Sequence, residues 1–130
     1  MDAYFSVSQS KTPTLEECLK GWKIHLNDIK IINQKFKKPI LFTEYGYRSV
    51  DYSEKQPWKS DRDMNQVNLQ VQNNTMQALY KTFWNEDWFA GGFIWKWFIN
   101  HNDVGGEENF MFIPQNKPVE TIIRQQYSLN

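Results

Sequence analysis

The stretch KPILFTEYGYRS, residues 38–49, decides the fold. An unbroken apolar run, Ile40 to Phe42, leads into a carboxylate at Glu44 and then into a loop that contains glycine. A strand of a parallel sheet is buried on both faces and therefore reads as such a run. Because a buried charge is costly, we expect Glu44 where the strand leaves the sheet, which in barrel enzymes is the catalytic face. Two structural interpretations stay open: Glu44 merely ends a strand, or it pairs with Arg48.

The composition limits the class of protein. Fifteen basic and fifteen acidic side chains balance, so nothing indicates a surface that binds nucleic acid or is attracted to a membrane. No apolar run reaches the roughly 18 residues of a membrane helix, no signal-peptide pattern opens the chain, and the compartment stays unknown. One cysteine excludes an internal disulfide, and with two scattered histidines we expect no metal site and no cofactor. The aromatic content is 16%, and several rings fall in polar loops, where rings often stack on a flat ligand.

Helices and strands alternate on either side of the opening stretch. A capping box, Thr14 with Glu17, begins a long amphipathic helix, whose apolar stripe places Cys18 and Trp22 in the core. His25 lies near that stripe and is interpreted as a packed, hydrogen-bonded histidine. The predicted elements are a strand end at 2–5, a helix from 14 to about 35, a strand at 39–44, a helix at about 68–85, a strand at 89–98 and a helix from 118 to about 127.

Strands that alternate with helices predict right-handed βαβ units and a parallel sheet. Three such strands would leave two open edges, which native folds normally cover. We therefore interpret residues 1–130 as one segment of a larger α/β barrel whose N-terminal strands are absent, so that the missing half or a second chain is needed for closure. A free-standing small α/β domain is the alternative. The long polar loop at 45–66 is expected to be either functional or disordered, since loops beyond about 12–15 residues are uncommon otherwise.

Four motifs in series resemble the C-terminal part of glycoside hydrolase family 113. They are DAYF at 2–5, FTEYGYRS at 42–49, GGFIWKWF at 91–98, and FIPQNKP at 112–118 with Glu120. The family comprises retaining β-mannanases that fold as a (β/α)8 TIM barrel, so the resemblance implies the end of barrel strand 6 through helix 8. It also implies an oligosaccharide or polysaccharide substrate, with hydrolysis of β-1,4-mannosidic linkages of hemicellulose by double displacement.

The resemblance assigns Glu44 to the catalytic nucleophile that closes strand 7, and Tyr4 to a tyrosine at the end of strand 6. A phenol beside Glu44 could donate a hydrogen bond that orients the carboxylate and favours its charged form. Retaining glycosidases use a second carboxyl group about 5–5.5 Å away as acid/base. In the family that group closes strand 4, which is absent here, and no other glutamate ends an apolar strand. The 130 residues alone are therefore predicted to be inactive, while the parent chain is active.

Three tryptophans are candidates for contact with sugar. Trp95 and Trp97 are predicted to share one strand face, and Trp97, nearer the mouth of the barrel, is the better stacking platform. For Trp95, two interpretations are equally favoured: contact with a ligand, or a place in the barrel interior. Trp58 lies in the long loop, where it either binds an outer sugar or pins the loop to the barrel.

Two polar residues complete the predicted substrate contacts. Arg48 either steadies its loop through a carboxylate or reaches a sugar hydroxyl. Asp2 shares a strand face with Tyr4 and touches either substrate or its neighbours. Lys96, by contrast, is interpreted as a surface lysine.

Two other functions stay open. A related barrel glycosidase could cleave a glucan, since the motifs do not fix the sugar. A carbohydrate-binding pseudo-enzyme could keep the aromatic platform without catalysis. Glu44 argues against the second, because pure binding gains little from a carboxylate that closes a buried strand.

Overall fold

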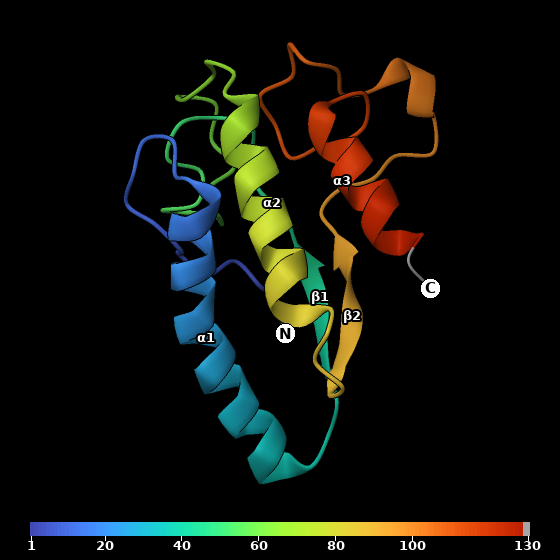
Figure 1. Ribbon diagram of the computed structural model, residues 1–130. Helices are drawn as coiled ribbons and strands as arrows, with labels where there is room; N and C mark the ends of the chain where they lie inside the picture. The colour runs from blue at the N-terminus through green and yellow to red at the C-terminus, as the bar shows by residue number, and fades with distance from the viewer. Residues whose placement is uncertain (129–130) are drawn as a thin grey trace.

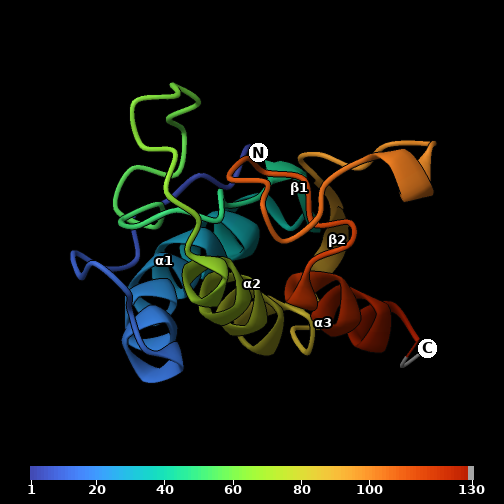
Figure 2. The ribbon, with the colours of Figure 1, turned by 90° about the horizontal axis from the view of Figure 1, so that it is seen from above.

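In the computed structural model, which describes residues 1–128, two parallel strands alternate with three longer helices and one short 3₁₀ turn. Helices and strands form two layers, with the three helices on one side of the strand pair (Figures 1 and 2). The described helices include none long and apolar enough to cross a membrane. The elements are α1 (Leu15–Phe36), β1 (Ile40–Tyr45), α2 (Leu69–Phe83), β2 (Phe89–Ile94), η1 (His101–Asp103) and α3 (Pro118–Tyr127).

The sheet is parallel, as predicted. Phe42 pairs with Gly92 in the register of β1 and β2. On the other side of β1, the N-terminal residues run parallel to the strand through an isolated bridge between Asp2 and Glu44. The amide of Ala3 donates to the carbonyl of Glu44 at 2.7 Å. The predicted strand end at 2–5 therefore lies beside β1, although its pairing is confined to a single bridge.

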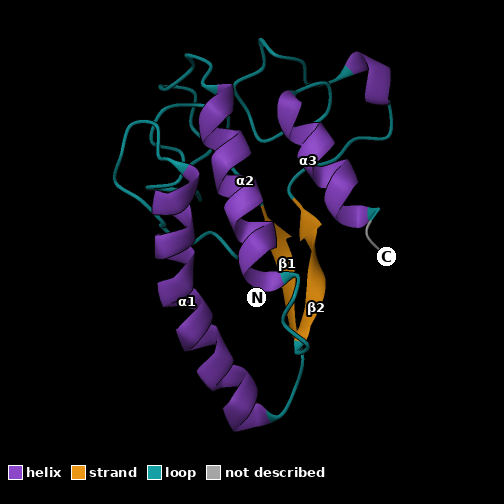
Figure 3. Ribbon diagram, in the orientation of Figure 1, coloured by secondary structure: helices purple, strands orange, loops and turns teal. Residues whose placement is uncertain are grey.

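The two ends of the sheet differ in their connections (Figures 1 and 3). Long segments gather where the strands end, and we call this the loop end. Short connections join each helix to the strand that follows it, and we call this the turn end. The loop end comprises residues 6–14, 46–68 and 95–117, and the turn end comprises residues 37–39 and 84–88.

Helix α1 begins and packs as its sequence predicts. The Thr14 hydroxyl accepts from the Glu17 amide at 3.1 Å, and the Glu17 carboxylate accepts from the Thr14 amide at 2.7 Å, which completes the capping box. Cys18 and Trp22 are fully buried. His25 Nε2 lies 2.8 Å from the Ser6 carbonyl oxygen, within hydrogen-bonding distance. The last turns of α1 extend past α2 toward the turn end (Figure 1). The apolar side chains of Ile31, Ile32 and Phe36 are therefore exposed there.

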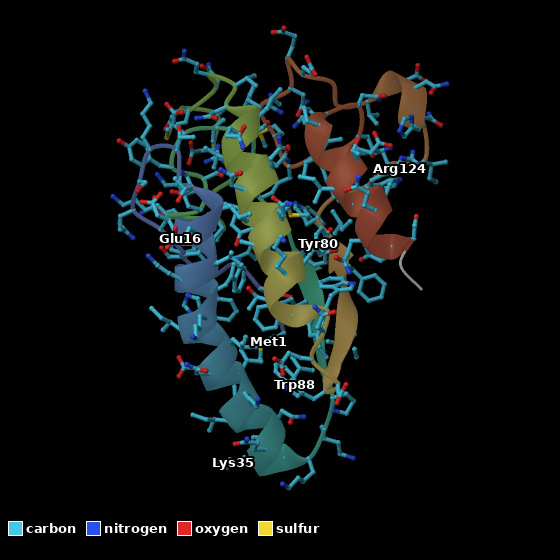
Figure 4. The ribbon with its side chains drawn as sticks, in the orientation of Figure 1. Met1, Glu16, Lys35, Tyr80, Trp88 and Arg124 are labelled. Atoms are coloured by element: carbon cyan, nitrogen blue, oxygen red, sulfur yellow. The ribbon has the colours of Figure 1, made fainter. Side chains whose placement is uncertain are left out.

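Aromatic rings fill the space between the two layers. Phe42 of β1 lies 4.9 Å from Phe83 and 4.8 Å from Phe89 between ring centroids, and Trp22 lies 5.4 Å from Phe83. These pairs meet edge to face, the arrangement that adds to the stability gained from area burial. Tyr80, labelled in Figure 4, reaches from α2 to the Tyr45 hydroxyl at 3.1 Å. The face of α2 that packs into this core includes Met76, Leu79, Tyr80 and Phe83, all buried.

The predicted strand at 89–98 is too long, because β2 ends at Ile94. Beyond it, the backbone amide of Phe98 donates to the Gln115 side chain at 2.7 Å, and the Phe98 carbonyl accepts from the same amide group at 2.9 Å. A buried glutamine thus replaces a neighbouring strand. Trp95 and Trp97 consequently do not share a strand face.

Two adjacent glycines of β2 have different roles. A Cβ on Gly92 would lie 2.9 Å from the Cβ of Phe42, so glycine allows the strands to approach there. Gly91 has no such neighbour, but its φ of +91° is a conformation that favours glycine. Gly92 therefore serves close approach of the strands, and Gly91 serves the conformation of the backbone.

Candidate functional site

Glu44 lies at the loop end, one residue before β1 ends, and its side chain is half-buried. The Tyr4 hydroxyl donates to its Oε2 at 3.1 Å, the hydrogen bond that the sequence analysis anticipated. Among residues 1–128, Glu44 forms no ion pair, so the alternative of a pair with Arg48 is wrong. The carboxylate is thus held by a neutral donor, with Oε1 free of protein hydrogen bonds within the described chain.

Tyr4 is suited to remain a donor. Burial, the hydrogen bond to Glu44 and the nearby charges of Glu44 and Asp2 raise the pKa of the Tyr4 hydroxyl well above its ordinary value. The phenol therefore keeps its proton throughout the neutral range. Asp2 itself is exposed, and its Oδ1 accepts from the Thr43 hydroxyl at 2.6 Å, so it touches a neighbour on β1.

The two tryptophans after β2 lie in different surroundings. The Trp95 amide donates to the Tyr45 carbonyl at 2.8 Å, which places Trp95 beside the residue that follows Glu44. A Cβ on Gly46 would lie 2.2 Å from the Trp95 carbonyl oxygen, so only glycine fits at this crossing. Trp97 instead lines a separate hollow of about 470 Å³, with its ring 6.3 Å from that of His101. The structure therefore brings Trp95, rather than the preferred Trp97, close to Glu44.

Arg48 and Trp58 lie in the long loop but differ in exposure. Arg48 is 4% exposed, and its Nη1 donates to the Asp61 carbonyl at 2.7 Å. It steadies the loop, as one interpretation required, but through a backbone carbonyl rather than a carboxylate. Burial lowers the pKa of this guanidinium from its ordinary value. A buried arginine of this kind does not face ligand, so the geometry disfavours its predicted contact with sugar. Trp58 is 58% exposed and open to a ligand.

A hollow of about 380 Å³ separates two of the segments at the loop end, and we call it the loop pocket. It adjoins the Glu44 region twice: Trp95 lines it, and so does Phe112, whose ring meets that of Tyr4 edge-on at 6.4 Å. The sequence analysis missed most of this pocket, because its shape depends on how two polar loops meet. Its lining residues are Ser60, Arg62, Trp95, Lys96, Asn109, Phe110, Met111, Phe112 and Ile113.

The buried side chain of Lys117 joins these two loops through hydrogen bonds. Its Nζ lies 3.0 Å from the Ser49 hydroxyl, 3.1 Å from Asn109 Oδ1 and 2.8 Å from the Met111 carbonyl oxygen. The side chain is buried, and burial lowers the pKa of Lys117 to about 7. Three acceptors match the three N–H groups of an ammonium. Sequence reasoning did not find this contact, since a lysine between Asn116 and Pro118 reads as a solvent-exposed residue.

Glu54 is the second buried charged group of the loop end. It is fully buried, and neither carboxylate oxygen has a hydrogen-bond partner among the described residues. Burial, reinforced by the charges of Glu17 and Asp51, raises the pKa of Glu54 to about 7. The Val7 amide donates to the Glu54 carbonyl at 3.1 Å, so Glu54 lies beside the N-terminal segment that leads into α1. Within residues 1–128, no group of three or more potential ligand side chains could hold a metal ion.

Comparison with known proteins gives one family and one fold. The model of Glycoside Hydrolase Family 113 matches residues 1–115, whereas no curated protein matches the chain. A GH113 β-1,4-mannanase structure determined as a complex has 24% identity and a TM-score of 0.75, covering 86% of this chain and 36% of that one. Another GH113 β-1,4-mannanase has 21% identity and a TM-score of 0.72, covering 99% and 38%.

A third similar structure is the GH113 β-mannanase AaManA from Alicyclobacillus acidocaldarius in complex with ManMIm. It has 20% identity and a TM-score of 0.75, covering 99% of this chain and 38% of that one. The chain thus spans between 36% and 38% of the length of these structures. The likeness shows the predicted fold, the C-terminal part of a (β/α)8 barrel.

Proposed function

This chain belongs to glycoside hydrolase family 113, and we propose that it carries the nucleophile of a retaining β-mannanase, Glu44. The observation that carries the proposal is the position of this carboxylate. It stands where a barrel strand ends at the loop end, hydrogen-bonded at 3.1 Å to a tyrosine and free of cationic partners within residues 1–128. In barrels of this kind, catalytic residues come from the C-terminal ends of strands.

The proposed chemistry follows from the two carboxylate oxygens. Tyr4 binds Oε2 and fixes the plane of the carboxylate, which leaves Oε1 to attack the anomeric carbon of the substrate. The bond to the leaving oxygen breaks as a second carboxyl group protonates that oxygen, and a glycosyl ester forms on Glu44. Water, deprotonated by the same second group, then hydrolyses the ester with net retention.

The second carboxyl group is proposed to come from outside these 130 residues. Retaining glycosidases place it about 5–5.5 Å from the nucleophile. Glu54, a buried glutamate of the long loop, lies beside Val7, whose amide donates to its carbonyl, and it does not end a strand. The chain spans 36% to 38% of the mannanase structures. We propose that a strand from the remaining part of a barrel of that length supplies this group. The chain alone is therefore proposed to be inactive on mannan.

The substrate contacts are proposed on the same basis. Trp95, which lies beside the strand end of Glu44, is the better platform for the sugar that is attacked, and Trp58 and Trp97 are proposed for outer sugars. Asp2 contacts Thr43 and is proposed to act on substrate only indirectly. Mannan is preferred over glucan because the similar structures are described as β-mannanases.

The test is a chimera in which this chain replaces the matching segment of the Alicyclobacillus acidocaldarius enzyme. We expect the chimera to hydrolyse β-1,4-mannan, and E44Q to lose at least about 10³-fold in kcat, since removal of a nucleophile abolishes the covalent step. The matched control is E16Q, a glutamate exposed on α1, which should retain activity.

Two results would reject the proposal. One is mannan hydrolysis by the isolated chain, and the other is an E44Q chimera that keeps its activity. Activity of the chimera on glucans alone would reject mannan as the substrate while retaining the glycosidase assignment. A chimera that binds mannan oligosaccharides without cleaving them, with its inherited strands intact, would favour the binding module.

A further inference from the structure

The loop pocket is lined by two cationic side chains and by no acidic one. Arg62 and Lys96 enter it from the two different loops, and its other lining residues are uncharged. Neither forms an ion pair within residues 1–128. The nearby carboxylate of Asp61 lies 3.7 Å from Lys59 and is thereby engaged. The pocket therefore presents positive charge that the described chain does not neutralise.

Both cations lie over aromatic rings. The Arg62 guanidinium carbon is 5.8 Å from the centroid of Phe110, and Lys96 Nζ is 5.6 Å from that of Trp95 and 5.0 Å from that of Phe98. Contacts of this kind hold a cation in place while leaving its N–H groups free to bind an anion. The predicted role of Lys96 as a plain surface lysine does not account for this placement.

The pocket has the size and composition of a ligand site. Its volume of about 380 Å³ lies within the about 300–1,000 Å³ typical of small-molecule pockets. Trp95, Phe110 and Met111 supply apolar surface for a sugar ring, and Ser60 and Asn109 supply hydrogen-bonding groups. Two of its lining residues also contact the neighbours of Glu44: the Trp95 amide donates to the Tyr45 carbonyl, and the Phe112 ring lies 6.4 Å from that of Tyr4.

Building on the proposed function, we propose that the loop pocket binds a sugar unit that carries a carboxylate, a uronic acid in a β-1,4-linked chain, through Arg62 and Lys96. The rings accept the apolar face of the pyranose, while the guanidinium and ammonium groups bind the carboxylate. An acidic polypeptide would satisfy the charges, but it would not use the aromatic rings of Trp95, Phe110 and Phe112 that line the pocket. A neutral sugar would use the rings and leave both cations without a partner.

A matched pair of tetrasaccharides tests this on the E44Q chimera, in which the barrel is complete and the tetrasaccharides are not cleaved. β-1,4-Mannotetraose and β-1,4-mannuronate tetrasaccharide share linkage and ring configuration and differ only in a hydroxymethyl or a carboxylate on each ring. By calorimetric titration at low salt, we expect the mannuronate to bind at least about 10-fold more tightly, as hydrogen bonds to charged groups predict. This advantage should shrink as sodium chloride is added, because ions screen exposed charges.

Variants identify the residues responsible. The double variant R62Q/K96Q should reduce mannuronate affinity to that of mannotetraose, while mannotetraose affinity stays within about two-fold. The control K55Q removes an exposed lysine from the same long loop, outside the pocket, and should leave the preference intact. Thermal melting of each variant confirms that it is folded.

Each remaining outcome overturns the proposal in a distinguishable way. If mannotetraose binds as tightly as the mannuronate, the anionic preference fails and the proposed function stands. If neither tetrasaccharide binds, the carbohydrate assignment of the loop end fails and this proposal falls with it. If hexaglutamate competes as well as the mannuronate does, the pocket responds to charge alone and recognises no sugar.

Discussion

The six tryptophans of this chain divide between two regions that use the same side chain differently. Trp22 is fully buried between the layers, and Trp84 and Trp88 pack against the same core. Figure 4 labels Trp88, which lies near the start of β2. At the loop end, by contrast, the tryptophans are between 41% and 58% exposed and belong to loops or to the residues just after β2; they are Trp58, Trp95 and Trp97.

The difference shows where stability and function lie in this fold. Core rings meet one another edge to face, so each one removed leaves a cavity that its neighbours cannot fill. Rings at the loop end lie beside polar groups and cations that form no ion pair within the described residues. Exposed rings in such surroundings are suited to bind a ligand rather than to pack in a core. Substitutions in the core should therefore affect folding, and those at the loop end should affect binding.

The largest expected effect comes from the core. Trp22→Ala should lower the free energy of unfolding by about 3–5 kcal/mol, because a ring packed against Phe83 and Phe42 is lost. Urea denaturation followed by circular dichroism measures this change. The control Trp58→Ala should change stability by no more than about 0.5 kcal/mol. Equal losses of unfolding free energy in the two variants would contradict the assignment of stability to the core and binding to the loop end.

A smaller loss of stability is expected when the hydrogen bonds of Lys117 to the two loops are removed. Lys117→Met approximately keeps the length of the side chain but leaves the Met111 carbonyl without this donor, and leaves Asn109 Oδ1 with the Met111 amide alone. The expected loss is about 2–3 kcal/mol of unfolding free energy, with mannotetraose affinity falling as well because the loop pocket loosens. Hydrogen exchange should show faster opening of residues 109–113 than of α1. Unchanged exchange in those residues would contradict the role of Lys117.

The partnerless carboxyl of Glu54 should be visible as a pH dependence. Its pKa is raised to about 7 in the folded chain from 4.5, so the folded state binds more protons between these values. The stability it contributes is complete below about pH 4.5 and is lost as the pH rises through 7. Glu54→Gln should abolish this loss, which we expect to be about 3 kcal/mol, and stabilise the chain at pH 8. Parallel pH profiles of the melting temperature for both proteins would refute the assignment.

The smallest effect separates two exposed tryptophans. Trp95→Ala should weaken mannotetraose binding about 10-fold, since one stacked ring is lost beside Glu44. Trp97→Ala, in its separate hollow, should weaken binding no more than about two-fold. Calorimetric titration of both variants makes the comparison directly. A larger loss in Trp97→Ala would restore the original preference for Trp97.

The local sequence predicted most of the scaffold. The capping box of Thr14 and Glu17 set the start of α1, and the apolar run before Glu44 set β1, because both signals lie within a few residues of the element they form. The hydrogen bond from Tyr4 was anticipated from the family resemblance, which assigns Tyr4 to the end of the strand before β1.

What the sequence did not predict depends on contacts between distant segments. β2 ends at Ile94, and the backbone of Phe98 beyond it pairs instead with the side chain of Gln115, 17 residues further along the chain. The burial of Lys117 and the meeting of Arg62 with Phe110 likewise follow from how two loops fold against each other. No periodicity or capping signal records such an encounter, so these parts of the site emerge only from the structure.

The central claim is that Glu44 forms a covalent bond with the sugar, and trapping that bond tests it most directly. A 2-deoxy-2-fluoro mannosyl fluoride slows breakdown of the ester and carries a leaving group that needs no acid, so the ester should accumulate. Incubating the chimera with this reagent, followed by proteolysis and mass spectrometry, is predicted to show one sugar adduct on Glu44 that is absent from E44Q. An adduct on any other residue of an active chimera would contradict the account.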